Sequence, residues 1–328
     1  MTTSISINGL GRIGRTILRQ ISTKGIDTNF RITRINDIAG LEMIAYLLRF
    51  DSIFGPFPGN IETTEDTIII NGQKIPFSTS ATLNIDLSDT DILLDCTGKA
   101  HTPEFAQLGL KAGSKKVLIS GPSPAAEVTI VFDVNEHELS DSKIISNASC
   151  TTNAVAPLLK SLDDKWGIES AHITTIHCYT GSQPMIDAPR VDMARSRAGA
   201  LSMVPTTTSA MPLIKRVLPH LAERISCAAL RVPTASVSAI DLVAQVCNLP
   251  KDNLETHIQA LADASTVMGW TQYQNVSCDM RAHSESIVLA LRETQRVGDR
   301  QLRILGWYDN EWGFSARMLD VAELMNKK

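Results

Sequence analysis

A glycine pattern close to the N-terminus constrains the fold of this chain more than any other feature. Gly9, Gly11 and Gly14 match G-x-G-x-x-G, directly after an alternating, strand-like segment at 4–7 and at the start of a helical one. Such glycines permit a tight turn, and amides at the helix start can bind a pyrophosphate. Asp37 ends the next strand-like segment, 23 positions after Gly14, where an acid can bind a ribose diol. An ordinary turn followed by a surface aspartate is the alternative, but the combined context favours a dinucleotide site.

The first part of the chain alternates strand and helix signals. Helical spacing of apolar residues is found at 14–25 and 104–111, and strand-like runs at 31–35, 91–95 and 116–120. Strands separated by helices predict βαβ units and an α/β fold with a doubly wound parallel sheet of the Rossmann type. A β-hairpin that turns at Asn-Gly is predicted at 67–75, inserted into this domain.

After about residue 150 the pattern changes to longer alternating segments. They lie at 172–176, 226–232, 236–249 and 284–290. These segments predict a mixed, largely antiparallel sheet with helices on one face, and hence a second domain of the α+β class. An amphipathic helix is predicted at 315–325, and its periodicity does not say on which domain it packs.

Length and composition agree with a two-domain protein of the cytoplasm. The chain has 328 residues and a net charge of −4, without a Lys/Arg cluster, so we expect no dedicated nucleic-acid partner. We expect no membrane span, because no apolar run approaches about 18 residues, and no signal peptide. The cysteines are scattered, which indicates free thiols in a reducing compartment and no zinc site; they are Cys96, Cys150, Cys178, Cys227, Cys247 and Cys278.

Cys150 is the candidate nucleophile, because it lies between the end of a predicted strand and the start of the helix that contains the helical run 154–162. The N-terminus of a helix is expected to lower the pKa of a thiol, and Ser149 and Thr151 offer groups for an anion. A buried small residue beside capping hydroxyls is the alternative, and this segment alone leaves the two interpretations about equal.

A base and phosphate-binding groups occur further along the chain. His177 ends a strand, and alternation means that His177 and Cys178 cannot both point into one site. The sequence leaves open whether His177 reaches Cys150. Arginines at 190–197, hydroxyls at 205–209 and Arg231 suit a phosphate, although a solvated loop with salt bridges would look similar.

Four strings together resemble the glyceraldehyde-3-phosphate dehydrogenase family. They are NGLGRIGR at 8–15, SNASCTTN at 146–153, HCYTG at 177–181 and WYDNEWG at 307–313. The resemblance implies a homotetramer and a C-terminal helix that returns to the first domain. The implied domains are an NAD-binding domain at 1–149 with 315–328, and a catalytic domain at 150–314.

The resemblance also implies a reaction and its residues. D-Glyceraldehyde 3-phosphate would be oxidised with NAD and inorganic phosphate to 1,3-bisphosphoglycerate, through a hemithioacetal and a thioester of Cys150, with His177 as the base. The implied cofactor residues are Gly9, Gly11, Arg12, Ile13, Gly14, Asp37, Thr97, Ser120 and Asn310. The implied substrate and phosphate residues are Ser149, Thr151, Thr180, Arg195, Thr208, Ser209 and Arg231.

The chain departs from the family pattern at several places. Ser182 stands for an Asp, Ala194 for an Arg, Ser209 for a Gly and Phe314 for a Tyr, and the segment between about 79 and 91 is short. Erythrose-4-phosphate dehydrogenase, a semialdehyde or acyl-phosphate reductase, and a catalytically weak NAD-binding interaction protein are the alternatives.

Two kinds of feature bear on cofactor choice. Asp37 favours NAD, because its carboxylate would repel a 2′-phosphate. The small residues Gly40 and Ala188, with Arg190, would admit NADP as a weaker cofactor if Asp37 turned away.

Overall fold

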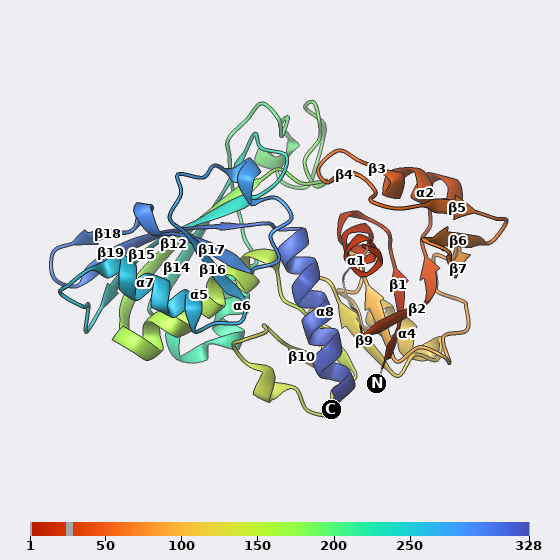
Figure 1. The fold of residues 1–328 in the computed structure, drawn as a ribbon, viewed down its shortest axis with the longest axis horizontal. Helices are drawn as coiled ribbons and strands as arrows, with labels where there is room; N and C mark the ends of the chain where they lie inside the picture. The colour runs from red at the N-terminus through yellow and green to blue at the C-terminus, as the bar shows by residue number, and fades with distance from the viewer. Residues whose placement is uncertain (1, 24–28, 328) are drawn as a thin grey trace. The chain divides into compact units, whose positions relative to one another are not determined.

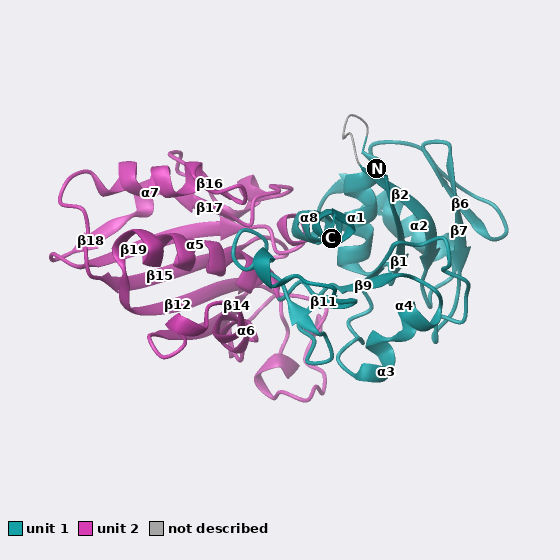
Figure 2. Cartoon of the chain, turned by 90° about the horizontal axis from the view of Figure 1, so that it is seen from below, with its two compact units in different colours: residues 1–148, 315–328 teal, residues 149–314 magenta. Residues whose placement is uncertain are grey.

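The computed structural model describes residues 2–23 and 29–327 and divides into two compact units. Unit 1 comprises residues 1–148 and 315–328, and unit 2 comprises residues 149–314, as Figure 2 shows in two colours. Figure 1 gives the element labels used below. Within the described residues, no helix has both the length and the hydropathy of a membrane span.

Unit 1 is built on one sheet, which within the described residues has nine strands in the order β10-β11-β9-β8-β1-β2-β7-β6-β5. The strands from β10 to β7 pair in parallel, which confirms the α/β class. Their bounds are β1 Thr3–Asn8, β2 Phe30–Asn36, β7 Gln73–Ser78, β8 Ile92–Asp95, β9 Lys116–Ile119, β10 Val128–Thr129 and β11 Ile144–Ser146. Both faces of the central strands are covered, since all six residues of β1 are buried.

The predicted hairpin is present and extends this sheet at its edge. It joins β6, Thr67–Ile70, to β7 through Asn71 and Gly72, and β6 also pairs with β5, Ile61–Thr63. Asn71 and Gly72 have φ of 52° and 85°, as a two-residue turn with a positive φ at both positions requires.

The helices of unit 1 follow the sequence patterns less closely. They are α1 Arg12–Ser22, α2 Leu41–Arg49, α3 Pro103–Ala106 and α4 Leu108–Lys111. The predicted end of the first helix, at Gly25, lies outside the described residues. The helical stretch predicted around 104–111 is present as two short helices separated by Gln107, and α2 was not predicted.

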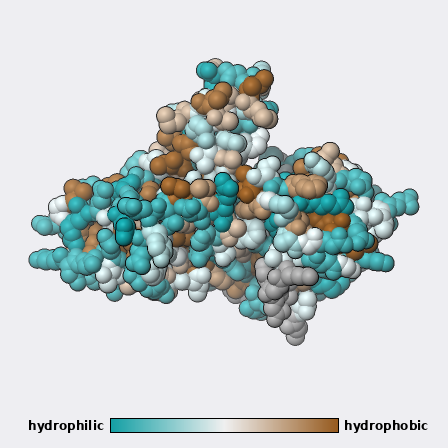
Figure 3. All heavy atoms as spheres, turned by 45° about the horizontal axis from the view of Figure 1, so that its top comes forward, coloured by the Kyte–Doolittle hydropathy of each residue, from teal (hydrophilic) through white to brown (hydrophobic). Residues whose placement is uncertain are grey.

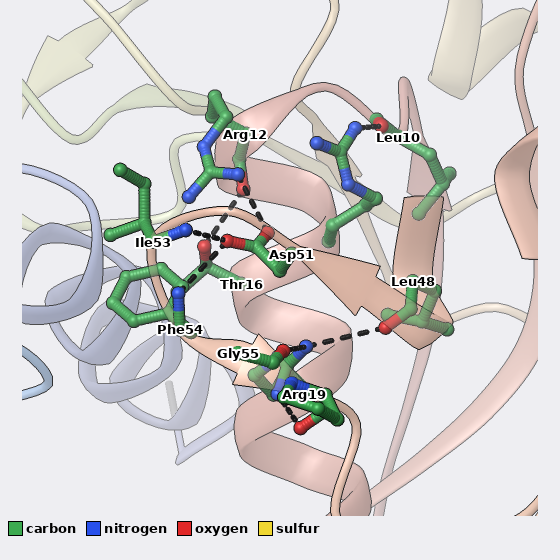
Figure 4. Close-up of polar contacts among 11 residues, drawn as sticks. Leu10, Arg12, Thr16, Arg19, Leu48, Asp51, Ile53, Phe54 and Gly55 are labelled. Atoms are coloured by element: carbon green, nitrogen blue, oxygen red, sulfur yellow. Dashed lines mark hydrogen bonds and ion pairs between the residues drawn. The ribbon is translucent and has the colours of Figure 1, made fainter. Parts of the chain in front are cut away.

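Two arginines on α1 hold the short ribbon of β3, Phe50–Asp51, and β4, Gly55–Pro56. The Arg12 guanidinium lies 2.6 Å from Asp51, and buried Arg19 donates to main-chain carbonyls that include that of Gly55 at 3.0 Å (Figure 4). These contacts attach the ribbon to the helix that begins at the glycine pattern.

Helix α8, Trp312–Lys327, begins three residues before its predicted start. From Ser315 onward it belongs to unit 1, where Lys116 donates to the Met325 carbonyl at 2.6 Å. Its fully buried apolar side chains are Met318, Val321, Ala322 and Met325.

Unit 2 contains a mixed sheet, which confirms the predicted α+β class. Within the described residues its order is β13-β14-β12-β15-β19-β17-β16, with β18 paired to β19. The central strand β12 is parallel to β14 and antiparallel to β15. The bounds are β12 Ile168–Cys178, β13 Val204–Thr206, β14 Ile225–Val232, β15 Ser238–Val246, β16 Met268–Thr271, β17 Ile287–Ala290, β18 Gln295–Val297 and β19 Gln301–Tyr308.

Helices cover one face of this sheet, and in Figure 1 they lie below it. They are α5 Cys150–Trp166, α6 Ala210–Val217 and α7 Leu254–Asp263. Burial alternates along β12: Ala171 and Ile173 are buried, whereas Ser170 and His172 on the other face are exposed. Five 3₁₀ turns complete the described chain, at Glu136–Glu138, Ala194–Ser196, Pro219–Leu221, Ser277–Met280 and Leu291–Glu293.

Candidate active site

Cys150 is the first residue of α5, the longest helix of unit 2. Ser149 caps this helix, because its Oγ accepts a hydrogen bond from the amide of Thr152 at 3.1 Å. A capping hydroxyl, that of Ser149, and a cysteine at the helix start therefore occur together, although the sequence analysis gave them as alternatives.

The structure brings Cys150 and His177 together. The Sγ of Cys150 lies 3.6 Å from Nε2 of His177, at the end of β12. The Nδ1 of His177 lies 2.7 Å from the carbonyl oxygen of Cys178. With the ring hydrogen on Nδ1 this carbonyl accepts it, Nη1 of Arg231, 3.0 Å from Nδ1, donates to the same carbonyl, and Nε2 faces the thiol with its lone pair. This is the arrangement of a nucleophile beside its base.

The amides of Cys150 and Thr151 at the helix start do lower the pKa of the thiol, but the net shift is upward, against the expectation. Burial raises the pKa of the Cys150 thiol, and the nearby charge of Arg231 only partly offsets it. Burial, followed by the charge of Arg231, lowers the pKa of His177 to about 4. Both shifts favour the neutral form of each group, so the nucleophile forms when a proton moves from Sγ to Nε2.

A cavity of about 330 Å³ opens in front of this pair, wholly within unit 2. Its lining includes the candidates Ser149, Thr151, Arg195, Thr208, Ser209 and Arg231. It also includes Thr207, from the predicted hydroxyl cluster at 205–209, and Thr175 and Ala229, which were not predicted. Thr180 does not line it, although its Oγ1 lies 3.4 Å from Arg231.

Two guanidinium groups give the cavity its positive charge. Arg231 donates to the carbonyl of Cys178 at 2.8 Å, and Arg195 donates to the carbonyl of Thr207 at 2.8 Å and to the hydroxyl of Thr206. These bonds fix the position of each guanidinium on the cavity wall. Arginine forks with nearby hydroxyls are suited to a phosphate group.

The hydroxyls of the candidate residues also have partners inside the protein. Thr151 bonds the hydroxyl of Tyr308 at 2.9 Å, and Tyr308 bonds Thr175 at 2.8 Å. The Oγ1 of Thr208 accepts from the amide of Ala210, the first residue of α6, at 3.1 Å. Tyr308 is buried, with its ring edge-on to His177 at 6.0 Å, and the sequence pointed to it only as part of the string at 307–313.

A second cavity, of about 250 Å³, lies in unit 1 and is lined by Gly9, Gly11, Asp37 and Thr97. A Cβ on Gly9 would lie 2.8 Å from the Cys96 carbonyl carbon, so the turn needs glycine there. A Cβ on Gly11 would meet nothing within 4 Å, so this position offers open space directly before α1. The exposed backbone at a helix start fits the pyrophosphate of a dinucleotide.

The remaining cofactor candidates do not line that cavity. A Cβ on Gly14 would lie 2.0 Å from the carbonyl oxygen of Gly9, so Gly14 serves close packing of α1. Arg12 is bound to Asp51, as described above, and Ile13 follows it on α1. Ser120 follows β9 and donates its amide to the Asp95 carbonyl at 2.9 Å. Asn310 belongs to unit 2.

Comparisons with known proteins agree with this geometry. The family model described as glyceraldehyde 3-phosphate dehydrogenase, NAD binding domain, matches residues 3–103, and the model of the C-terminal domain of the same family matches residues 149–310. A glyceraldehyde-3-phosphate dehydrogenase from Xanthobacter flavus is 41% identical over 334 residues, which cover 100% of this chain and 99% of the relative.

Two further relatives extend the comparison. A protein of the same name from Cereibacter sphaeroides is 41% identical over 337 residues, covering 100% of this chain and 99% of the relative. Glyceraldehyde-3-phosphate dehydrogenase 2 from Bacillus subtilis is 37% identical, covering 98% and 96%. The resemblance noted in the sequence is confirmed, and the chain belongs to the glyceraldehyde-3-phosphate dehydrogenase family of NAD-dependent oxidoreductases.

Proposed function

We propose that the protein oxidises D-glyceraldehyde 3-phosphate to 1,3-bisphosphoglycerate, with NAD and inorganic phosphate as co-substrates. The observation that carries this proposal is the 3.6 Å contact of Cys150 Sγ with His177 Nε2 at a cavity with two arginines. Thiol, base and anion-binding groups are what an aldehyde with a phosphate group needs for covalent oxidation.

In this mechanism His177 moves the protons. Nε2 takes the thiol proton as Sγ of Cys150 attacks the aldehyde carbon, and the proton passes to the carbonyl oxygen to give a hemithioacetal. His177 then accepts the hydroxyl proton as the carbon is oxidised to a thioester. NAD, when bound, supplies the acceptor for the hydride. An oxygen of inorganic phosphate attacks the thioester carbon, and the Cys150 sulfur leaves and recovers a proton.

Two anion sites share the cavity in this proposal. Ser149, Thr151, Thr208, Ser209 and Arg231 receive the inorganic phosphate. Thr180 and Arg195, again with Arg231, receive the phosphate of the substrate. Arg231 is supported as the common group by its position beside both Cys150 and Thr180.

NAD is assigned to the cavity of unit 1, where the open space at Gly11 and the start of α1 suit a pyrophosphate. The backbone at Arg12, Ile13 and Gly14 starts that helix. Asp37 binds the adenosine ribose, Thr97 and Ser120 flank the cofactor, and Asn310 binds the nicotinamide amide. NADP is the weaker cofactor.

We further propose a homotetramer that works in the cytoplasm. The loop that follows β12 carries apolar side chains that are largely exposed. In Figure 1 it is among the green loops that project from the molecule, and Figure 3 shows hydrophobic surface, in brown, on this projecting part. The exposed apolar side chains on the loop or at its end are Met185, Ile186, Val191, Met193, Leu201 and Met203. Apolar surface of this kind is typical of a contact with another subunit.

A substrate panel tests the proposed reaction. The purified protein is assayed for NADH absorbance with glyceraldehyde 3-phosphate, erythrose 4-phosphate and aspartate semialdehyde, each with and without inorganic phosphate. The proposal expects the highest kcat/KM with glyceraldehyde 3-phosphate, and only with phosphate present. Preference for the four-carbon sugar phosphate supports the erythrose enzyme instead, and NAD binding without turnover of any aldehyde supports an interaction protein.

A further inference from the structure

Cys178 adjoins the catalytic pair, as the last residue of β12 and the neighbour of His177. Its Sγ lies 3.8 Å from Nδ1 of His177, on the side of the ring away from Cys150. The residue is 1% exposed. No step of the proposed mechanism uses its thiol, so its contacts require their own explanation.

The thiol of Cys178 contacts the side chain of Asn310. Its Sγ lies 3.1 Å from Oδ1 of Asn310. The hydroxyl of buried Ser238 lies 3.4 Å from the same oxygen and accepts from the amide of Cys178 at 3.1 Å. Since burial raises the pKa of the Cys178 thiol to about 12, the thiol keeps its hydrogen at neutral pH. Two donors therefore meet the oxygen of the carboxamide.

This arrangement determines which end of the carboxamide is presented to a ligand. An asparagine side chain has an accepting oxygen and a donating nitrogen of nearly the same shape, and its orientation follows from the surrounding donors and acceptors. If the group were reversed, Nδ2 would face the Cys178 sulfur, a weak acceptor, and the hydroxyl of Ser238, which already accepts from the amide of Cys178. With Oδ1 held by Cys178 and Ser238, Nδ2 is directed away from them as a donor.

We propose that Cys178 is a positioning residue for cofactor binding, because its thiol holds Asn310 with the carboxamide nitrogen presented to the carbonyl of the nicotinamide amide. The inference rests on the proposed function, which assigns Asn310 to that amide. It adds that the cysteine, and not only the asparagine, determines the affinity for the nicotinamide end of NAD.

The short hydrogen bonds that hold His177 and Arg231 use a different atom of Cys178 from the thiol. His177 and Arg231 both bind the main-chain carbonyl oxygen of Cys178, at 2.7 and 2.8 Å. A substitution of the side chain leaves that oxygen in place. Loss of the thiol should therefore weaken NAD binding while the reactivity of Cys150 is retained. A substitution that merely disturbed the structure around Cys178 would lower both.

The test compares two substitutions that differ only in the donor. Cys178→Ala removes it, whereas Cys178→Ser replaces it with a hydroxyl. The Kd for NAD is measured by calorimetry, and the rate at which iodoacetamide inactivates or labels Cys150 is measured without cofactor. Cys227→Ala is the matched control, because Cys227 lies on the adjacent strand β14 and its thiol contacts the Ala228 carbonyl at 3.9 Å. Thermal unfolding checks that each variant is folded.

We expect Cys178→Ala to weaken NAD binding by roughly threefold to tenfold, the effect of losing one modest hydrogen bond. Cys178→Ser should restore the affinity, and all variants should label at Cys150 at the rate of the unaltered protein. In Asn310→Ala, the further change Cys178→Ala should have no additional effect on Kd. Unchanged affinity in Cys178→Ala, failure of the serine to restore it, or an additive double variant overturns the inference.

The proposed function and the inference can fail separately in this design. Normal NAD affinity without oxidation of glyceraldehyde 3-phosphate by the unaltered protein contradicts the proposed function, and the binding series still decides the role of Cys178. Turnover of the substrate with a Kd that does not respond to Cys178→Ala contradicts the inference alone. Failure of the unaltered protein to bind NAD contradicts both.

Discussion

Arg231 and His177 bind the same carbonyl oxygen, that of Cys178, the arginine through Nη1 at 2.8 Å and the histidine through Nδ1 at 2.7 Å. Nη1 and Nδ1 are consequently only 3.0 Å apart. A fixed positive charge at this distance disfavours a second charge on the imidazole and favours a negative charge on the neighbouring thiol. Arg231 therefore acts on both members of the Cys150–His177 pair.

The first prediction concerns this charge. Arg231 lowers the pKa of both Cys150 and His177, so its removal in Arg231→Gln should raise both. Less thiolate is then present at pH 7, and the midpoint of the pH dependence of Cys150 alkylation by iodoacetamide should move to higher pH. The rate is followed by mass spectrometry across the pH range. Arg216→Gln, an exposed position on α6, is the control, and a midpoint that is the same in both variants would contradict the assignment.

The second prediction concerns the nucleophile. Burial raises the pKa of Cys96 and Cys178 to about 12 and that of Cys227 to about 11, and none of these thiols has the Nε2 of His177 beside it. Iodoacetamide should therefore label Cys150 first. Cys150→Ser should abolish dehydrogenase activity, and His177→Asn should slow labelling because the proton acceptor is lost.

Labelling rates of the individual cysteines are compared by peptide mass spectrometry. The exposed Cys247 and Cys278 serve as internal references, since they report the reactivity of thiols outside the site. Equal rates for Cys150 and these two, together with activity in Cys150→Ser, would exclude Cys150 as the nucleophile.

Features encoded by neighbouring residues could be predicted from the sequence. The strand before Gly9 and the start of a helix after Gly11 follow from local spacing, and the hairpin follows from the ability of Asn71 and Gly72 to adopt positive φ. Helix α2, Leu41–Arg49, was missed because it is short and begins after Gly40, which has no side chain to cap it. Its buried residues, including Ile44 and Leu48, are too few to mark a helix by their spacing alone.

Features that depend on distant residues could not be predicted in the same way. Cys150 and His177 meet only because α5 and β12 pack in one unit, and nothing local to either residue encodes that contact. The direction of the Cys150 pKa was wrong for the same reason. A helix start can be recognised in the sequence, whereas the burial that outweighs it arises from strands and loops elsewhere in the chain.

The third prediction concerns assembly. Ile186 and Leu201 are 77% and 82% exposed on the loop after β12, where the proposed tetramer needs apolar surface. The unaltered protein should have the mass of a tetramer by light scattering, and Ile186→Asp with Leu201→Asp should shift it to smaller species because charges are costly to bury. Val297→Asp, on β18, adds a charge at an exposed apolar position outside the loop and should leave the mass unchanged. A monomer that is stable and active without substitution would refute the proposal.

The fourth prediction concerns the choice between NAD and NADP, on which the contacts of Asp37 bear directly. One carboxylate oxygen accepts from the amide of Leu10 at 2.5 Å, and the other accepts from the amide of Ala39 at 2.7 Å. Turning Asp37 away to admit a 2′-phosphate would break both bonds, so the small neighbour Gly40 is not sufficient to make room. The carboxylate should therefore stay at the edge of the cavity in unit 1 and repel the phosphate.

We expect kcat/KM to favour NAD by at least about tenfold, consistent with a repulsion on the order of 1–3 kcal/mol between partly desolvated charges. NADP activity should be measurable in the unaltered protein and should rise in Asp37→Gly, which removes the charge and opens space. Asp37→Asn is the matched control, because it removes the charge while keeping an oxygen that can accept from Leu10 or Ala39. If charge repulsion disfavours NADP, kcat/KM with NADP should rise in both variants. If lack of space disfavours NADP, it should rise only in Asp37→Gly. Steady-state kinetics with both cofactors decide between these, and equal or better use of NADP by the unaltered protein would show that the carboxylate does not select the cofactor.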